Sequence, residues 1–188
     1  MFHRQLAVLS VPLWDKAKCI WPESLRPAGL DTFERESFDS WWSKHRNELA
    51  NLHSLIAEQW IYRHWDESCF SFLPLNTLAW ETRMASSEDF LYQVNLFFGG
   101  PVDAEHDYKV FHDNQLQTAK NWANETWTIP PIVLETPRGF VFNRKTYPDT
   151  RLLLVEGSKR YRYLNALHKK YLHTGLHKFF VIRSPLCY

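Results

Sequence analysis

The sequence predicts an α+β fold, in which a small mixed sheet with a βαβ unit packs on an aromatic-rich helical N-terminal region. Apolar residues recur at helical spacing from Phe38 to about Asp66, whereas short β-branched runs separated by proline and glycine turns follow Trp127. The 188 residues, 45% of them hydrophobic, suit one domain or one small domain with a helical elaboration. We expect residues 1–126 to form the helical region and residues 127–188 the sheet-bearing domain, as two parts or as one compact unit.

The N-terminal region predicts an irregular lead-in followed by two helices. Residues 1–30 contain three prolines and a glycine, which break regular structure. One long amphipathic helix is expected from Phe38 to between Arg63 and Asp66. A second helix begins after Ser86, because Asp89 follows three residues later as in a capping box, and it is expected to end at Gly99-Gly100-Pro101.

The remaining segments of this region are shorter and less regular. Residues 69–75 predict a turn or buried connection, and residues 116–123 predict one short helix. Residues 103–114 are polar and are expected to form a loop. This segment contains His106 and His112 among four acidic residues, so a metal site is the alternative interpretation. We prefer a solvated loop, because the sequence contains no H-E-x-x-H or paired-cysteine ligand motif.

The C-terminal region predicts strands joined by tight turns, then a helix and a closing strand. Residues 132–134 and 140–142 are short apolar strands around a Thr-Pro-Arg-Gly turn, the second being a returning strand, and a further turn lies at residues 147–149. Residues 152–155 are all apolar, which is typical of a strand buried on both faces. A helix from Ser158 to about Leu172 and a strand at residues 178–182 complete a βαβ unit.

The turn from the buried strand into this helix is the predicted functional site. Gly157 lets the backbone approach a ligand closely, and the helix N-terminus after it favours an anion. Ser158, Lys159 and Arg160 add a hydroxyl, an ammonium and a guanidinium, which together suit a phosphate. The competing interpretation is structural: Gly157 only permits the turn, and Arg160 pairs with Glu156 or with an N-terminal acid.

Two segments around this turn resemble the ParB/sulfiredoxin superfamily. They are PIVL at residues 131–134 and LLVEGSKRYRYL at residues 153–164. Members have a P-I-x-V strand, then an apolar strand followed by an acid or small residue, glycine, two variable residues and an arginine that opens a helix. The resemblance covers about 55 residues.

The resemblance implies a nucleotide or other phosphorylated ligand, with ATP or CTP and Mg²⁺ as the expected cofactors. It implies these ligand-binding residues: Gly157, Ser158, Lys159, Arg160 and Arg162. Glu156 and Arg160 are the implied catalytic residues, with Glu156 as base or magnesium ligand. An enzyme of this kind would be a phosphoanhydride hydrolase, a phosphotransferase or a nuclease.

The sequence also departs from the family. Ser158 stands where a sulfiredoxin has its reactive cysteine, so repair of sulfinic acid is not expected. Nothing after Arg183 resembles the DNA-binding helix-turn-helix of ParB, so a role in chromosome segregation does not follow.

Charge and aromatic content leave two other functions open. Residues 127–188 carry a net charge of +8 and the rest of the chain −7, so the basic part is a candidate for nucleic-acid binding, or the two parts simply neutralise each other. Nine Trp and 13 Phe serve either a core or an interface, and the adjacent Trp41 and Trp42 are the candidate anchor for a protein partner or for self-association. The family's character would place such a module in bacteria, in a mobile-element or phage-defence setting.

Cysteine usage and hydropathy predict a cytoplasmic protein. The three cysteines are far apart and odd in number, which predicts neither a disulfide framework nor a zinc site. No run approaches the about 18 apolar residues of a membrane span, and the apolar run from Leu6 to Leu13 is too short for a signal peptide, so we expect no membrane association.

Overall fold

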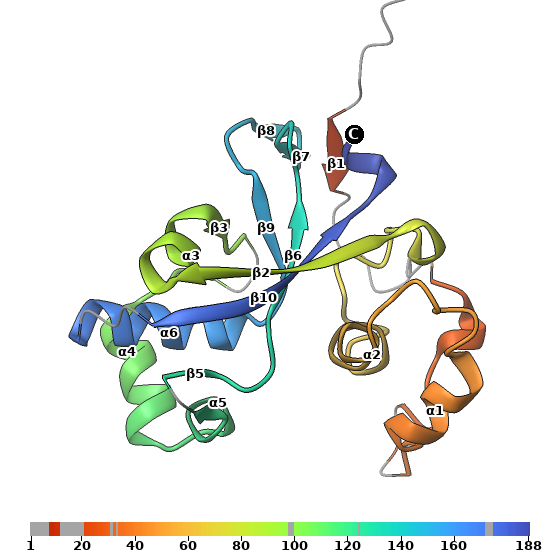
Figure 1. The fold of residues 1–188 in the computed structure, drawn as a ribbon, viewed down its shortest axis with the longest axis horizontal. Helices are drawn as coiled ribbons and strands as arrows, with labels where there is room; N and C mark the ends of the chain where they lie inside the picture. Colours follow the sequence, from red (N-terminus) through yellow and green to blue (C-terminus); the bar gives the residue numbers. More distant parts are fainter. Residues whose placement is uncertain are drawn as a thin grey trace, which may run out of the picture. The chain divides into compact units, whose positions relative to one another are not determined.

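The chain divides into two units in the computed structural model (Figure 1). The structure describes residues 8–11, 21–30, 32, 34–97, 100–123, 125–171 and 175–188. The first unit comprises Met1–Trp80, Thr136–Asp149 and Ile182–Tyr188, and the second comprises Glu81–Glu135 and Thr150–Val181. Each unit therefore takes residues from both sides of the boundary expected between residues 126 and 127.

A five-stranded mixed sheet, built mainly from the second unit, confirms the α+β class. Its strands, in spatial order, are β2 (Ala79–Ser86), β10 (Leu176–Arg183), β6 (Ile132–Glu135), β9 (Leu152–Glu156) and β3 (Val94–Asn95). Strand β9 pairs with β6 in antiparallel register, Val133 opposite Leu154, and with β3 in parallel register, Val94 opposite Leu152. Figure 1 shows β2 and β10 running beside each other along one edge.

The core of the second unit lies between this sheet and its helices. Helices α3 (Ser87–Gln93) and α6 (Ser158–Tyr171) contribute Phe90 and Leu164, which are fully buried together with Val133 and Val181 of the sheet. Elements β9, α6 and β10 follow one another as predicted, although β6 lies between the two strands in the sheet.

Helix α3 begins as predicted but ends early. The Ser86 hydroxyl accepts a hydrogen bond from the amide of Asp89 at 3.1 Å and donates one to Asp89 Oδ2 at 2.6 Å. The helix ends at Gln93 rather than at the predicted glycines, because Val94 and Asn95 pair with β9 as strand β3. Gly99 lies outside the described residues.

The polar segment after residue 103 is helical, so the loop expected there is wrong. Helix α4 (Ala104–Tyr108) continues into the π-helix η5 (Lys109–Asp113), and Asp103 caps the start by accepting from the amides of Glu105 and His106. Beyond it lie α5 (Gln117–Lys120), β4 (Trp122–Ala123) and β5 (Thr126–Trp127). The short helix expected at residues 116–123 is therefore present but ends in a strand.

The long helix expected from Phe38 is interrupted in the first unit. It forms α1 (Phe38–His45), then α2 (Ser54–Ile56) and the π-helix η3 (Ala57–Tyr62). The Asn51 amide donates to the carbonyls of Leu75 and Leu78, at 2.9 and 2.8 Å, and the His53 ring starts the next helix by accepting from the amide of Leu55. Hydrogen bonds from these polar side chains to backbone groups compete with a continuous helix, and the spacing of the apolar residues does not reveal them.

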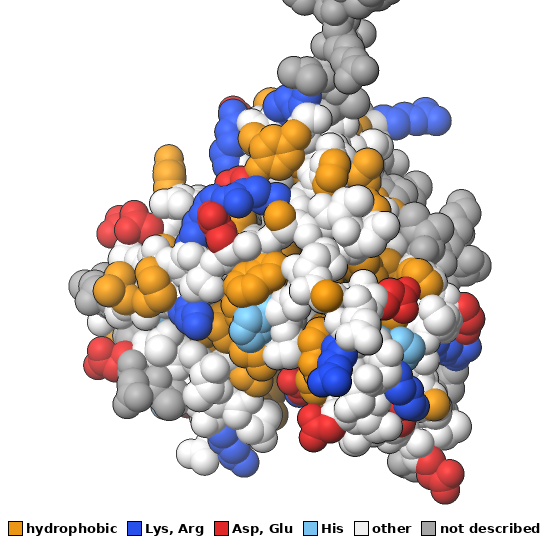
Figure 2. All heavy atoms as spheres, turned by 45° about the vertical axis from the view of Figure 1, so that its right-hand side comes forward, with side chains coloured by type: hydrophobic (Ala, Val, Ile, Leu, Met, Phe, Trp, Pro, Cys, Tyr) orange, Lys and Arg blue, Asp and Glu red, His pale blue; other side chains and the backbone are white. Residues whose placement is uncertain are grey.

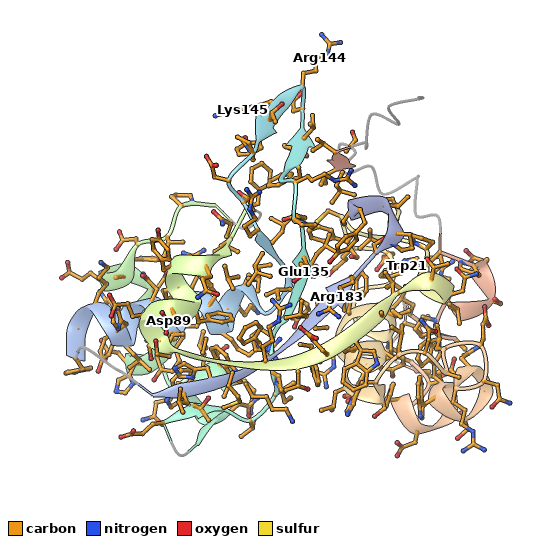
Figure 3. The ribbon with its side chains drawn as sticks, turned by 45° about the horizontal axis from the view of Figure 1, so that its top comes forward. Trp21, Asp89, Glu135, Arg144, Lys145 and Arg183 are labelled. Carbon is orange, nitrogen blue, oxygen red and sulfur yellow. The ribbon has the colours of Figure 1, made fainter. Side chains whose placement is uncertain are left out.

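A three-stranded sheet, β1 (Leu9–Val11), β7 (Phe140–Phe142) and β8 (Lys145–Tyr147), also belongs to the first unit. The returning strand predicted at residues 140–142 is thus present, and it pairs with β1 and β8. Asn143 and Arg144 have φ values of 47° and 63°, the left-handed pair that a two-residue hairpin requires. Figure 3 shows Arg144 and Lys145 at the tip of this hairpin.

Indole rings form much of the core of the first unit. Trp41 and Trp60 are fully buried, and their ring nitrogens donate to the carbonyl of Leu25 at 2.9 Å and the hydroxyl of Ser68 at 2.8 Å. The unit also contains the short helical turns η2 (Glu23–Leu25), η4 (Leu75–Thr77) and η6 (Pro185–Cys187). Among the helices of the described residues, none combines the length and apolar character that crossing a membrane requires.

Candidate functional site

The corner between β9 and α6 requires a glycine for two reasons. Gly157 is buried and has a φ of +107°, a backbone conformation that other residues rarely adopt. A Cβ atom added there would lie 2.7 Å from Cβ of Pro131, the residue that precedes β6. The amide of Tyr161 donates to the Gly157 carbonyl at 2.9 Å and so begins the helix directly after this residue. The predicted strand, glycine and helix therefore meet in one tight turn.

An ion pair spans the corner. Arg160 Nη2 donates to Glu156 Oε2, and the two side chains are only 17% and 20% exposed. A Cβ atom on Gly157 would also lie 3.1 Å from the Arg160 guanidinium, which shows that the guanidinium packs over the glycine. The pairing of Arg160 with Glu156, which the competing interpretation predicted, is therefore present. It neutralises the charge of the Glu156 carboxylate.

The remaining positive charge at the corner belongs to Lys159. Its side chain is exposed, whereas Ser158 is half-buried. The first turn of α6 carries no acidic residue. The amides of a first helical turn have no partner within the helix, and the helix dipole places partial positive charge at the same end. A cation there is unfavourable unless an anion joins it, so the corner is electrostatically suited to one.

The carboxyl end of β3 lies at the same edge of the sheet as this corner. Strands β3 and β9 are parallel and paired at Asn95 and Leu153, so the chain leaves both strands on one side. In α/β sheets, ligands commonly bind beyond the carboxyl ends of parallel strands. The segment that starts at Leu96 therefore leaves the sheet on the side where Gly157 lies.

Arg162, the remaining predicted ligand-binding residue, is directed elsewhere. Its Nε lies 2.9 Å from both carboxylate oxygens of Asp107 on α4, and Nη2 lies 2.6 Å from Oδ1. Asp107 is 1% exposed, so this is a nearly buried ion pair. The structure thus brings Glu156, Gly157 and Arg160 together and holds Arg162 against a different helix.

A second polar network that the sequence did not predict joins three elements of the second unit. His177 on β10 lies 2.8 Å from the hydroxyl of Ser87 through Nε2 and 2.9 Å from the hydroxyl of Thr126 through Nδ1. Ser87 and His177 are completely buried, and the two contacts of the imidazole join α3 and β5 to β10. Ser87 and His177 are 90 residues apart in the chain, and no local motif marks the pairing.

Comparisons of this chain with protein-family models, with curated proteins and with solved structures gave no match. Within the described residues, no three His, Cys, Asp or Glu side chains gather in a group that could hold a metal ion.

Proposed function

We propose that the protein binds a nucleotide or another phosphorylated ligand at the corner formed by residues 156–160. The observation that carries this proposal is the start of α6, where an exposed Lys159 and the first-turn amides follow a buried glycine without any acidic residue in that turn. A phosphate there would accept hydrogen bonds from the amides and a charge-assisted bond from Lys159. The half-buried hydroxyl of Ser158 would complete its contacts.

The Glu156–Arg160 pair would allow ligand binding to activate a catalytic carboxylate. A phosphate competes with a carboxylate for a guanidinium, and both form bidentate pairs with arginine. If Arg160 turns from Glu156 to the ligand phosphate, this ion pair breaks, and the Glu156 carboxylate would then serve as a base or as a magnesium ligand. A single carboxylate suits Mg²⁺, because proteins often hold this ion through one or two carboxylates together with phosphate oxygens and water. Phosphohydrolase or phosphotransfer activity toward ATP or CTP is therefore the proposed reaction class.

Calorimetric titration with ATP and CTP, each with and without Mg²⁺, tests the binding. A nucleotide at 100 times its dissociation constant should add about 2.7 kcal/mol to the free energy of unfolding. Lys159→Ala should weaken binding at least tenfold. Lys169→Ala is the matched control, because Lys169 is also exposed but lies in the last turn of the same helix. Equal affinities of the two variants, or no binding by the wild-type protein, would exclude the corner.

The consequence for Glu156 can be tested separately. Glu156→Gln should preserve nucleotide binding and abolish any release of inorganic phosphate, because the amide cannot act as a base. Arg160→Ala should weaken binding, because it removes the guanidinium that would contact the phosphate. Unchanged phosphate release by Glu156→Gln would show that this carboxylate is not catalytic.

We also propose, as a second function, self-association or binding of a protein partner through α1. Trp42 is half-buried and stacks on Phe38 with ring centroids 5.9 Å apart, so part of its indole is accessible. Accessible tryptophans are frequent anchors of protein interfaces. A continuous basic surface for nucleic acid has less support, because Lys and Arg side chains are interspersed with Asp and Glu on the face drawn in Figure 2.

A further inference from the structure

A small polar cavity lies in the second unit, formed by residues outside the corner at Gly157. Its volume is about 200 Å³, and it is lined by His112, Gln115, Ala119, Lys120 and Tyr163. These residues come from η5, the turn after it, α5 and α6. Three of them carry hydrogen-bonding groups or charge at the rim, where His112, Gln115 and Lys120 are exposed, whereas Tyr163 is buried.

A tyrosine–histidine hydrogen bond joins the interior of the cavity to its rim. The Tyr163 hydroxyl lies 2.7 Å from Nδ1 of His112, and the tyrosine is only 3% exposed. Its ring is fixed edge-on against Trp122, with centroids 5.4 Å apart. Burial raises the pKa of Tyr163, with a smaller contribution from Tyr171, so the hydroxyl stays protonated at neutral pH.

The histidine is also held on its other side. Its ring stacks on that of Tyr108 at a centroid distance of 4.5 Å, and Lys170 Nζ lies 3.7 Å from the centroid of the Tyr108 ring. Since Nδ1 of His112 is used by Tyr163, the nitrogen left to meet a ligand is Nε2. The imidazole is thus an oriented group at the rim of the cavity.

Two unusual backbone features build this cavity. The π-helix η5 places His112 beside Tyr163, and a π-type bond runs from the amide of Leu116 to the carbonyl of Phe111 at 3.0 Å. Gln115 then adopts a left-handed conformation, with a φ of 50°, before α5 begins. Single π-turns and left-handed non-glycine residues cost free energy and are concentrated at functional sites. Here both occur in consecutive turns that line the same cavity.

We infer that this cavity is a binding site for a small acidic molecule, whose carboxylate or phosphate group is held by Lys120 and by Nε2 of His112, while the Tyr163 hydroxyl orients the imidazole. Among the described residues, the lining contains an ammonium, an imidazole, an amide and a hydroxyl but no carboxylate, so its chemistry favours an anion. Ligand pockets for drug-sized molecules have volumes of about 300–1,000 Å³. A cavity of about 200 Å³ therefore suits a ligand of few atoms.

Titration with inorganic phosphate and with acetate, followed by the imidazole NMR signals of His112, tests this site. We expect a saturable shift of the His112 signals with at least one of the two anions, and the anion that produces it identifies the class. Lys120→Met and Tyr163→Phe should each weaken that binding at least tenfold. Tyr163→Phe keeps the buried ring and removes only the hydroxyl, and circular dichroism confirms that both variants are folded.

Two control variants separate this site from other sources of anion binding. Lys109→Met removes an exposed lysine of η5 that does not line the cavity, and Lys159→Ala removes the lysine of the Gly157 corner. Both should bind the anion at the cavity as the wild type does. The inference is overturned if neither anion saturates the His112 shift, or if Lys109→Met weakens binding as much as Lys120→Met.

Discussion

Arg162 on α6 donates hydrogen bonds to the carboxylate of Asp107 on α4 through two of its nitrogens, Nε and Nη2. Nε lies 2.9 Å from each carboxylate oxygen and Nη2 lies 2.6 Å from Oδ1. Hydrogen bonding to Asp107, against the opposing effect of burial, raises the pKa of Arg162 above its usual value. One side of the polar segment after residue 103 is therefore packed on α6, with Asp107 buried there, while its other side is exposed.

Removing the charge of Asp107 should destabilise the protein strongly. Asp107→Asn leaves Arg162 beside a neutral and nearly buried partner, and the expected loss is about 3 kcal/mol in the free energy of unfolding. Arg162→Lys should lose less, because it keeps the charge and only the paired geometry is lost. Urea denaturation measures both. A loss under about 0.5 kcal/mol for Asp107→Asn would show that the pair contributes little.

Gly157→Ala should cost more stability than Gly100→Ala, mainly because a Cβ atom at residue 157 would collide with Pro131. Both glycines have positive φ, 107° and 78°. A Cβ atom at residue 100 would have no atom of the described residues within 4 Å, whereas one at residue 157 would lie 2.7 Å from Pro131 Cβ. We expect about 1 kcal/mol for Gly100→Ala from backbone strain alone and at least about 2 kcal/mol for Gly157→Ala. Equal losses would mean that the corner relaxes without cost.

Leu154→Asp should prevent folding. Leu154 is 4% exposed, faces the core of the second unit and lies on β9, which is paired on both sides. A carboxylate without a partner in that core is more costly than the stability of a typical domain allows. Lys169→Asp is the control, because it also introduces an aspartate but at an exposed position of α6. A soluble Leu154→Asp protein with the wild-type circular dichroism spectrum would contradict this role of β9.

The adjacent tryptophans of α1 should differ in what they contribute. Trp41 is fully buried and hydrogen-bonded to Leu25, so Trp41→Ala should lose at least 3 kcal/mol. Trp42 is half-buried, and Trp42→Ala should lose about 1 kcal/mol and should abolish any self-association seen by analytical ultracentrifugation. Retained association in a folded Trp42→Ala protein would exclude α1 as the interface.

Alkaline pH should weaken the contact between α4 and the end of α6. The hydrogen bond that joins the hydroxyls of Tyr108 and Tyr171, together with burial, raises the pKa of Tyr108 to about 12, above the ordinary tyrosine value of about 10. The folded protein therefore favours neutral Tyr108, and this stabilisation is complete below about pH 10 and is lost as the pH rises through about 12. In a tyrosinate absorbance titration, Tyr171→Phe should move the ionisation of Tyr108 to lower pH. Tyr92→Phe, which removes a tyrosine that is 87% exposed, should leave it unchanged.

Local sequence patterns are sufficient to predict the features that depend on neighbouring residues. The cap at Ser86, the strand at residues 152–155, the glycine turn and the helix that follows it all lie where local spacing and turn chemistry placed them. Each is specified by residues within a few positions of one another, because caps, turns and periodicity are short-range effects. The six residues proposed from the sequence were equally local, and five of them form the corner at Gly157.

The features that depend on distant partners arise from contacts that form when the chain folds. Asp107 pairs with Arg162, which lies 55 residues further along the chain, and His112 bonds to Tyr163, which lies 51 residues further. The segment that contains Asp107 and His112 was predicted to be a polar loop, but it is helical and lines a cavity. The bonds of Asn51 to Leu75 and Leu78 likewise interrupt a helix whose apolar spacing is continuous. Spacing along the chain reports which face of an element is apolar, but it does not report which polar group that face will meet. Hydrogen-bond partners brought together by folding determine that, because buried polar groups must be satisfied wherever the chain places them.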